Sequence, residues 1–363
     1  MKNRVVVAMS GGVDSSVAAA ILQAKGFEVI GLTMCLNLAE AGGRRPACCG
    51  VAAIEDARRV AHKLGIRHYV VNMGKALEEK VIADFLSEYL AGRTHNPCVR
   101  CNQFIKFGVL LEKALSLGAQ YLATGHYARI RKVEGRRSKV KGYTLCKARD
   151  ARKDQSYFLY RLTQQQLRHT FFPVGDYTKP QVRALAKKFS LPVAEKPESQ
   201  EICFVPQDDY RAFLRRRCPA KLRPGSVLDS SGKEVGRHAG IALYTIGQRE
   251  GLGIALGYPA YIIKIDPRRN AISVGRKEEA FSRALLVKAP HFILAPPKKK
   301  VALQVKIRYN HRQSPAVGTP LKGRLLVSFE QPQFAVSPGQ SAVFYRGETV
   351  IGGGIIERAL DYA

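Results

Sequence analysis

The chain has 363 residues, and because 46% of them are apolar it can bury the cores of two or three domains and is not a disordered chain. Its 59 Lys and Arg against 29 Asp and Glu leave a formal net charge of +30, which favours a polyanionic partner. No apolar run approaches the roughly 20 residues that span a bilayer, and eight cysteines are too sparse for a secreted disulfide scaffold. The sequence therefore predicts a cytoplasmic protein that binds no membrane.

The basic residues gather in three runs. Residues 131–153 hold ten Lys and Arg against two acids, and residues 211–223 and 296–312 each hold six and no acid. A single run of this kind is usually a solvated surface, but three in an already basic chain favour nucleic acid as the partner.

The first two hundred residues alternate between strand and helix patterns. Buried strands are expected at residues 5–9, 29–34, 68–73 and 121–124, with helices at 15–24, 53–64, 76–90 and 104–117. This alternation predicts an α/β fold with a doubly wound parallel sheet, in which ligands lie beyond the carboxyl ends of the strands. The run Gly125-His126-Tyr127 is expected at such an end.

The pattern changes after about residue 205. Turn residues between 211 and 257 predict a small central α+β or β domain. Short strands then recur at 285–287, 301–307, 325–329, 341–345 and 349–356, as in a β-barrel or sandwich, and we predict a C-terminal β-barrel. The expected domains are residues 1–205, 206–271 and 272–363.

A glycine-rich turn follows the first expected strand. Ser10-Gly11-Gly12-Val13-Asp14-Ser15-Ser16 reads as a tight turn into a helix, whose free N–H groups and positive dipole end suit an anion such as pyrophosphate. The turn lacks the Gly-Lys-Ser/Thr ending of a Walker A loop, so phosphoryl transfer of the kinase type is not indicated. The pattern SGGxDS resembles the PP-loop of the ATP pyrophosphatases, which adenylate a substrate and release pyrophosphate. Asp14 would either organise Mg²⁺ at the phosphates or cap the helix.

Two cysteine sites stand out. Cys98 and Cys101 lie in Asn96-Pro97-Cys98-Val99-Arg100-Cys101-Asn102, where a nearby helix start, Arg100 and Lys106 are expected to lower the pKa of the Cys101 thiol. Cys203 lies between Ile202 and Phe204, a setting more typical of a small core residue. One CxxC pair is weak evidence for zinc. Structural or incidental roles are expected for the others, which are Cys35, Cys48, Cys49, Cys146 and Cys218.

Together the motifs resemble one family. They are NPCxxCN, ATGHYA, KDQSYFL, SQEICF, YTIGQREGLGI, SPGQSAVFY and IGGGII, in this order, and the resemblance extends from the first strand almost to Ala363. The chain is similar in them to the tRNA-specific 2-thiouridylases. The resemblance implies ATP-dependent 2-thiolation of the wobble uridine in tRNAs for lysine, glutamate and glutamine.

The resemblance also assigns residues. It implies ATP contacts at Ala8, Met9, Ser10, Gly11, Gly12, Val13, Asp14, Ser15, Met34 and Gly125, and catalytic thiols at Cys101 and Cys203. It implies tRNA contacts at Asn96, Pro97 and Cys98 near the target base, and at His126, Lys153, Asp154, Gln155, Arg308, Tyr309 and Gln340. Tyr127 and Tyr309 would suit stacking on a splayed base of the anticodon stem-loop.

The implied mechanism begins with adenylation of the uracil O2 by ATP, with Mg²⁺, and release of pyrophosphate. Sulfur arrives as a persulfide on Cys203 from an external donor protein or cysteine desulfurase relay, and attacks C2. Cys101 then releases the sulfur, leaving a Cys101–Cys203 disulfide for a reductant to reopen.

One residue departs from the pattern, because some members carry Asp where this chain has Cys98. An alternative mechanism follows, in which Cys98, Cys101 and Cys203 hold three irons of a [4Fe–4S] cluster. Two alternative functions stay open at this point: another PP-loop tRNA-modifying enzyme, or a non-catalytic RNA-binding protein.

Overall fold

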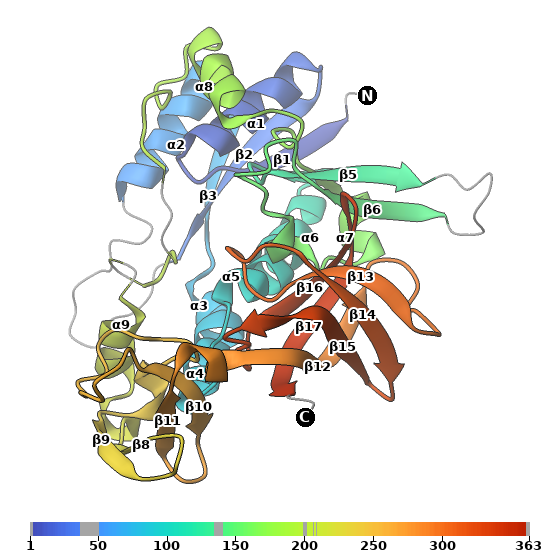
Figure 1. Ribbon diagram of the computed structural model, residues 1–363. Coiled ribbons are helices and arrows are strands. Elements are labelled where there is room, and N and C mark those ends of the chain that lie inside the picture. Colours follow the sequence, from blue (N-terminus) through green and yellow to red (C-terminus); the bar gives the residue numbers. More distant parts are fainter. Residues whose placement is uncertain are drawn as a thin grey trace. The chain divides into compact units, whose positions relative to one another are not determined.

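The computed structural model describes residues 3–36, 51–133, 141–198, 202–205, 207 and 209–360. The chain forms two compact units, which the colours of Figure 1 help to follow along the sequence. The first unit comprises Met1–Ile82, Pro97–Asp208 and Glu348–Ile351. The second comprises Ala83–Asn96, Asp209–Gly347 and Gly352–Ala363.

A parallel sheet of order β3-β2-β1-β4-β7 forms the centre of the first unit. Its strands are β1 (Arg4–Ala8), β2 (Glu28–Cys35), β3 (Arg67–Asn72), β4 (Tyr121–Thr124) and β7 (Thr170–Phe171). The predicted α/β fold with a parallel sheet is confirmed, and all four expected strands are present. The sequence did not reveal β7, since two residues are too few to show a periodic pattern.

The first unit also contains helices between and after its strands. They are α1 (Val13–Ala24), α2 (Val51–Leu64), α3 (Gly74–Leu77), the π-helix η2 (Glu78–Ile82), α5 (Pro97–Arg100), the π-helix η3 (Cys101–Val109), α6 (Leu110–Ser116), the short η4 (Ser156–Leu159), α7 (Gln164–Arg168) and α8 (Lys179–Lys188). The small residues Ala18, Ala19 and Ala20 let α1 pack closely in the core with Val5 and Val7 of β1. Helix α1 also packs against α2 and α8 (Figure 1).

The helix expected at 104–117 begins earlier than predicted. Helices α5, η3 and α6 follow one another without a break from Pro97 to Ser116. Proline is favoured in the first turn of a helix, because its fixed φ suits the helix and its missing N–H has no intrahelical partner there. Cys101 therefore lies one turn inside helical structure instead of at its start.

An antiparallel hairpin formed by β5 (Ala128–Val133) and β6 (Gly142–Lys147) carries part of the first basic run. Strand β6 pairs with Thr349 and Val350 at the start of β17. Glu348 lies 3.1 Å from Arg129 and 3.3 Å from Arg131, so part of the charge of this run is paired within the protein.

The second unit contains a small sheet of order β10-β11-β8-β9. Its elements are β8 (Gly225–Leu228), β9 (Glu234–His238), β10 (Tyr261–Asp266) and β11 (Ala271–Gly275), with α9 (Tyr210–Arg217), η6 (Pro219–Lys221) and η7 (Ile241–Leu243). Strand β11 continues this sheet to Gly275, past the expected boundary at 271/272. The three domain boundaries themselves stay a prediction.

Helix α4 (Ala83–Leu90) belongs to the second unit, although the sequence placed it with residues 1–205. Aromatic side chains hold it to α9: the Phe85 and Phe213 rings are 6.0 Å apart, and those of Tyr89 and Tyr210 are 4.9 Å apart. Such long-range aromatic packing has no local sequence signal.

A closed six-stranded β-barrel completes the second unit, and the predicted barrel is confirmed. Its strands, preceded by η8 (Lys277–Ala280), are β12 (Phe281–Phe292), β13 (Val301–Lys306), β14 (Ser314–Leu321), β15 (Arg324–Phe334), β16 (Ser341–Arg346) and β17 (Thr349–Leu360). Pairing of β12 with both β15 and β17 closes it. The sequence missed β14, because Pro315 and Pro320 argue against a strand within a sheet. None of the helices in the described ranges is long and apolar enough to cross a membrane.

Candidate functional site

The turn after β1 depends on two glycines. Gly11 has a φ of +71°, and a Cβ there would lie 2.2 Å from the carbonyl oxygen of Ala53 in α2. Only glycine fits this position. Gly12 is the N-cap of α1 and has an extended backbone. The turn therefore lies against α2 and leads directly into α1.

Serine hydroxyls hold the turn from inside. Ser15 Oγ accepts a hydrogen bond from Ser10 N at 3.2 Å and donates to the Gly12 carbonyl oxygen at 3.2 Å. Ser16 Oγ donates to the same carbonyl at 2.8 Å. The N-cap makes no side-chain hydrogen bond to α1, so the first N–H groups and the positive end of the helix dipole face the turn. This arrangement suits a phosphate group.

Strand β4 ends beside the same helix start, as expected for neighbouring parallel strands. A Cβ on Gly125 would lie 2.6 Å from Ser15 N and 2.8 Å from the Asp14 carbonyl carbon. Of the other predicted ATP contacts, Ala8, Met9 and Val13 flank the turn, and Met34 is half-buried near the end of β2. These ATP contacts stay predictions.

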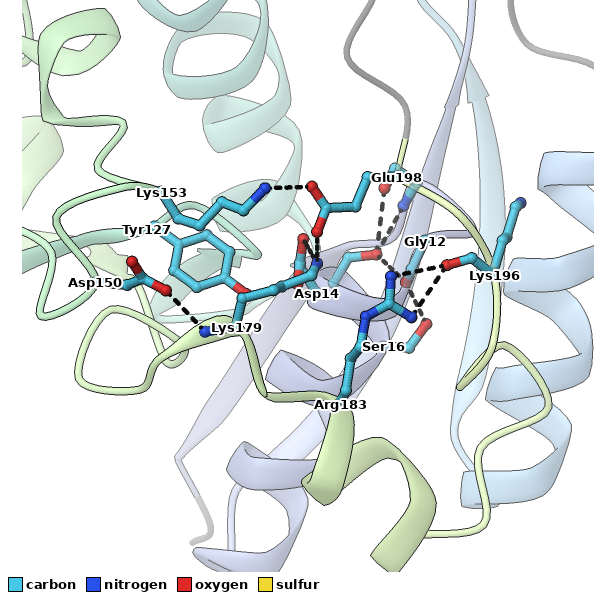
Figure 2. Close-up of polar contacts among 12 residues, drawn as sticks. Gly12, Asp14, Ser16, Tyr127, Asp150, Lys153, Lys179, Arg183, Lys196 and Glu198 are labelled. Atoms are coloured by element: carbon cyan, nitrogen blue, oxygen red, sulfur yellow. Dashed lines mark hydrogen bonds and ion pairs between the residues drawn. The ribbon is translucent and has the colours of Figure 1, made fainter. Parts of the chain in front are cut away.

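Asp14 does not cap α1. Its carboxylate accepts hydrogen bonds from Lys179 Nζ, at 2.7 Å and 2.9 Å, and from the Tyr127 hydroxyl at 2.8 Å. Figure 2 shows all three side chains converging at the turn. With its oxygens engaged in this way, Asp14 does not offer Mg²⁺ an open carboxylate in this conformation.

Tyr127 is buried, so its predicted role in stacking on an RNA base is wrong. Burial and the neighbouring Asp14 carboxylate raise the pKa of the Tyr127 hydroxyl far above its usual range. The hydroxyl therefore stays protonated and donates to Asp14.

Glu198 joins two lysines next to the turn. Its Oε1 lies 3.1 Å from Lys179 Nζ and its Oε2 lies 2.6 Å from Lys153 Nζ (Figure 2). Burial alone would raise the pKa of Glu198, but the hydrogen bonds from both lysines lower it, so the carboxylate is ionised. Lys153, a predicted tRNA contact, is thus part of the network around Asp14.

Lys196 contacts the other side of the turn. Its Nζ donates to the Gly11 carbonyl oxygen at 2.9 Å and pairs with Asp56 Oδ2 of α2 at 2.5 Å. The hydrogen bond from Lys196 is the main cause that lowers the pKa of the Asp56 carboxyl. Arg183 of α8 donates to the Ala194 carbonyl oxygen at 3.2 Å and so holds the same segment.

The environment of Cys101 differs from the expectation. The thiol is buried at the start of η3, inside continuous helical structure, and burial raises its pKa while the charge of Lys106 lowers it to a smaller extent. The expected lowered pKa is therefore wrong, because the sequence shows the nearby cations but not the loss of solvent. Asn102 next to it is also buried, and among the described side chains its Oδ1 lacks a hydrogen-bond partner.

The three cysteines of the alternative cluster mechanism do not come together. Cys101 is buried, Cys98 is half-buried and Cys203 is exposed. Within the described residues no group of three or more His, Cys, Asp or Glu side chains could hold a metal ion, so these thiols do not fit a cluster in this conformation. Cys35, Cys146 and Cys218 are likewise free of disulfides. Cys48, Cys49 and the Ser199–Glu201 part of SQEICF lie outside the described residues.

Other predicted tRNA contacts of the first unit bond within the protein. His126 is buried, with Nδ1 2.7 Å from Thr124 Oγ1, and burial followed by the Lys106 charge holds its pKa well below the usual range. Asp154 accepts from Ser156 Oγ at 2.8 Å, and Gln155 Oε1 accepts from Tyr127 N at 3.0 Å. Pro97 and Cys98 lie in α5.

The predicted tRNA contacts of the second unit have different surroundings. Arg308 donates to the backbone carbonyl oxygens of Phe334 and Ala335 at 3.1 Å and 3.3 Å. The Tyr309 ring lies 5.4 Å from Lys306 Nζ, and Asn96 is half-buried. Gln340 Oε1 is buried, and the structure as described gives it no hydrogen-bond partner. The contact of Gln340 with tRNA stays a prediction.

Sequence reasoning missed Lys179, Lys196 and Glu198. Local patterns do not distinguish these three from the rest of the 59 Lys and Arg and 29 Asp and Glu of the chain. Only the fold brings them to the turn.

Family models match three consecutive segments of the chain. The tRNA methyl transferase HUP domain matches residues 3–207, the tRNA methyl transferase PRC-barrel domain matches 211–276, and the Aminomethyltransferase beta-barrel domain matches 282–356. With the parallel sheet and its glycine turn, these matches define a nucleotide-binding α/β protein of the PP-loop class.

Similar proteins identify the family within this class. The chain is 52% identical over 367 residues to tRNA-specific 2-thiouridylase MnmA of Pelotomaculum thermopropionicum, and 50% identical over 363 residues to tRNA-specific 2-thiouridylase MnmA 1 of Caldanaerobacter subterraneus, with 99% of each chain covered. The chain belongs to the tRNA-specific 2-thiouridylase family. A solved 4-thiouridine synthetase in complex with RNA and ATP is 15% identical over 60% of this chain and 51% of its own, and its TM-score of 0.34 is too low to carry any argument.

We predict that Gly125→Ala destabilises the protein by about 1–3 kcal/mol, because the added Cβ meets the backbone of α1 and rigid backbone cannot yield cheaply. The free energy of unfolding, measured by denaturant titration, tests this. Gly12→Ala is the matched control in the same turn, since its Cβ would lie 3.6 Å from Ser10 Oγ, an ordinary contact. Equal stability of the two variants would contradict the packing described for Gly125.

We predict that Lys106→Met moves the pH profile of Cys101 alkylation to higher pH. Removing a positive charge further disfavours the thiolate, which is the nucleophile, and so raises the Cys101 pKa. Peptide mapping after iodoacetamide treatment at a series of pH values measures the profile. Lys113→Met on α6 is the control, and an unmoved profile in Lys106→Met would show that this lysine does not act on the thiol.

Proposed function

We propose that this chain catalyses the ATP-dependent 2-thiolation of the wobble uridine of tRNA, with tRNAs for lysine, glutamate and glutamine as acceptors. Family membership supports the reaction. The observation that carries the proposal is the start of α1 behind Gly11 and Gly12, where no side-chain cap occupies the helix N-terminus and Lys179 lies close by. This is a site for the phosphates of ATP within the same unit as Cys101 and Cys203.

In the first step the O2 of uracil attacks the α-phosphate of ATP, and pyrophosphate leaves. The helix N-terminus and Lys179 stabilise the negative charge that collects on the leaving pyrophosphate. Mg²⁺ bound together with ATP would supply Lewis-acid polarisation of the phosphates. Asp14 would hold it only after exchanging Lys179 for the metal, so no step is assigned to Asp14.

In the second step the terminal sulfur of a Cys203 persulfide attacks C2 of the activated uridine, and the C2–O2 bond breaks to release AMP. The Cys101 thiolate then attacks the Cys203 sulfur of the adduct. A Cys101–Cys203 disulfide forms, the S–S bond to the product sulfur breaks, and 2-thiouridine leaves. An external dithiol reductant restores both thiols. The exposure of Cys203 supports its loading by a donor protein, and the burial of Cys101 supports the protection of a resolving thiol from oxidants.

We predict 2-thiouridine in unmodified tRNA after incubation with the protein, ATP, Mg²⁺, a persulfide donor and a dithiol, detected by mass spectrometry of the nucleosides. Cys203→Ser and Cys101→Ser abolish the product, because each removes one sulfur of the relay. Cys218→Ser is the matched control and keeps full activity. Full product with Cys203→Ser, or none with the wild type, contradicts the proposal.

A second experiment separates the persulfide route from the cluster route. It measures the content of iron and acid-labile sulfide in anaerobically purified wild type and in Cys98→Ser.

A second prediction concerns the basic runs, which we propose contact tRNA phosphates. Raising salt from about 50 to 200 mM weakens tRNA binding on the order of 10³-fold if about six phosphates are neutralised. Replacing the exposed Lys298, Lys299 and Lys300 by Gln lowers the slope of log K against log salt by up to about three. Lys75→Gln with Lys80→Gln, outside the runs, leaves the slope unchanged. A flat salt response would leave the runs as solvated surface.

A further inference from the structure

Tyr127 is fixed at both ends by residues of the first unit. It is only 3% exposed, and its hydroxyl donates to Asp14 Oδ1 at 2.8 Å (Figure 2). Gln155 engages both backbone polar groups of the tyrosine: its N–H donates to the Tyr127 carbonyl oxygen at 2.8 Å, and its Oε1 accepts from Tyr127 N at 3.0 Å. Tyr127 therefore joins Asp14 of the nucleotide turn to the segment 153–155, whose contact with tRNA is predicted.

Asp14 in turn decides where the Lys179 ammonium group lies. Lys179 Nζ donates to both carboxylate oxygens of Asp14, at 2.7 Å and 2.9 Å, whereas Glu198 offers it one oxygen at 3.1 Å. Two acceptors fix the direction of the ammonium group more closely than one. The backbone of Lys179 is held separately, because its N–H donates to Asp150 Oδ2 at 3.0 Å. The Asp14 carboxylate therefore orients the end of the side chain, while Asp150 holds its base.

The Tyr127 hydroxyl acts on this ion pair in two ways. Its hydrogen bond holds Oδ1 of Asp14 in place and so restricts rotation of the carboxylate. It also takes up part of the negative charge of that oxygen, so Lys179 is neutralised less completely. Without the hydroxyl, the carboxylate would interact more strongly with Lys179 and leave less of its charge for an anion bound at the start of α1.

We infer that Tyr127 is a positioning residue for Lys179: through Asp14, it holds the ammonium group beside the first turn of α1, where the pyrophosphate of ATP collects negative charge. Gln155 supports the Tyr127 backbone and so takes part in the same arrangement. The inference rests on the proposed function for the role of Lys179, whereas the contacts among these residues do not depend on the reaction.

Binding of inorganic pyrophosphate, measured by calorimetry without tRNA or a sulfur donor, tests the inference. Tyr127→Phe should bind pyrophosphate about fivefold more weakly, which is the size expected when one contact in a network is lost. Lys179→Gln also weakens binding, and adding Tyr127→Phe to it should have no further effect, because the hydroxyl acts through the lysine. An equal loss with and without the lysine, or a wild-type affinity in Tyr127→Phe, overturns the inference.

Tyr121→Phe is the matched control. Tyr121 lies in β4, the strand that leads to Tyr127, and its ring packs on those of Phe27 and Phe171, with centroids 6.5 Å and 4.4 Å away. This variant should bind pyrophosphate as the wild type does, so the loss of a tyrosine hydroxyl in general is distinguished from the loss of the contact with Asp14.

Gln155 has its own variant. Gln155→Met removes the side-chain acceptor for Tyr127 N while keeping a side chain of similar length. Pyrophosphate binding should weaken in the absence of tRNA, an effect that a role confined to tRNA contact does not produce. Melting temperatures near that of the wild type confirm that the variants fold, and unchanged pyrophosphate binding in Gln155→Met overturns the part assigned to Gln155.

Single-turnover kinetics give a readout that a purely structural role would not move. If Lys179 stabilises the leaving pyrophosphate, Tyr127→Phe lowers the rate constant of tRNA-dependent pyrophosphate release about fivefold and leaves the half-saturating tRNA concentration unchanged. An unchanged rate constant overturns the inference. A wild type that binds neither pyrophosphate nor ATP overturns it together with the proposed function, whereas the expected non-additive binding in a protein that makes no 2-thiouridine contradicts the proposed function alone.

Discussion

The ion pairs of the Lys179 side chain connect the glycine turn to the rest of the first unit. Its Nζ lies 2.7 Å from Asp14 and 3.1 Å from Glu198, and its backbone N–H donates to Asp150 at 3.0 Å. Breaking a fully buried ion pair costs about 3–5 kcal/mol, because the remaining charge is left uncompensated. Asp14 and Glu198 are 31% and 26% exposed, so water would take up part of that loss. Lys179 reaches this place because α8 packs against α1.

The turn is therefore not simply a basic pocket in a basic protein. Lys153, Lys179 and Lys196 face the carboxylates of Asp14, Asp56 and Glu198. A polyphosphate bound as proposed would compete with these carboxylates for the lysines. Backbone geometry supplies the anion site through Gly11, Gly12 and the start of α1, while the side-chain ion pairs connect that site to the rest of the unit.

Burial, more than ion pairing, sets the environment of the thiols. Cys101 lies in helical structure, and burial makes its thiolate less favourable than the neighbouring cations suggest. Cys203 is exposed on the segment that follows Lys196 and Glu198. A buried and an exposed thiol suit different tasks, because exposure permits loading and burial limits oxidation.

The sequence by itself determined the parallel sheet, the glycine turn and the barrel, because strand periodicity and glycine placement are local properties of the backbone. It did not reveal β7, which is too short, or β14, which contains two prolines. The tertiary structure alone decided that α4 packs on α9, that Tyr127 is buried with its hydroxyl on Asp14, and that the Cys101 pKa is raised. It also selected Lys179 and Glu198 from 59 Lys and Arg and 29 Asp and Glu. Burial and ion pairing depend on residues far apart in the chain, so only the folded protein specifies them.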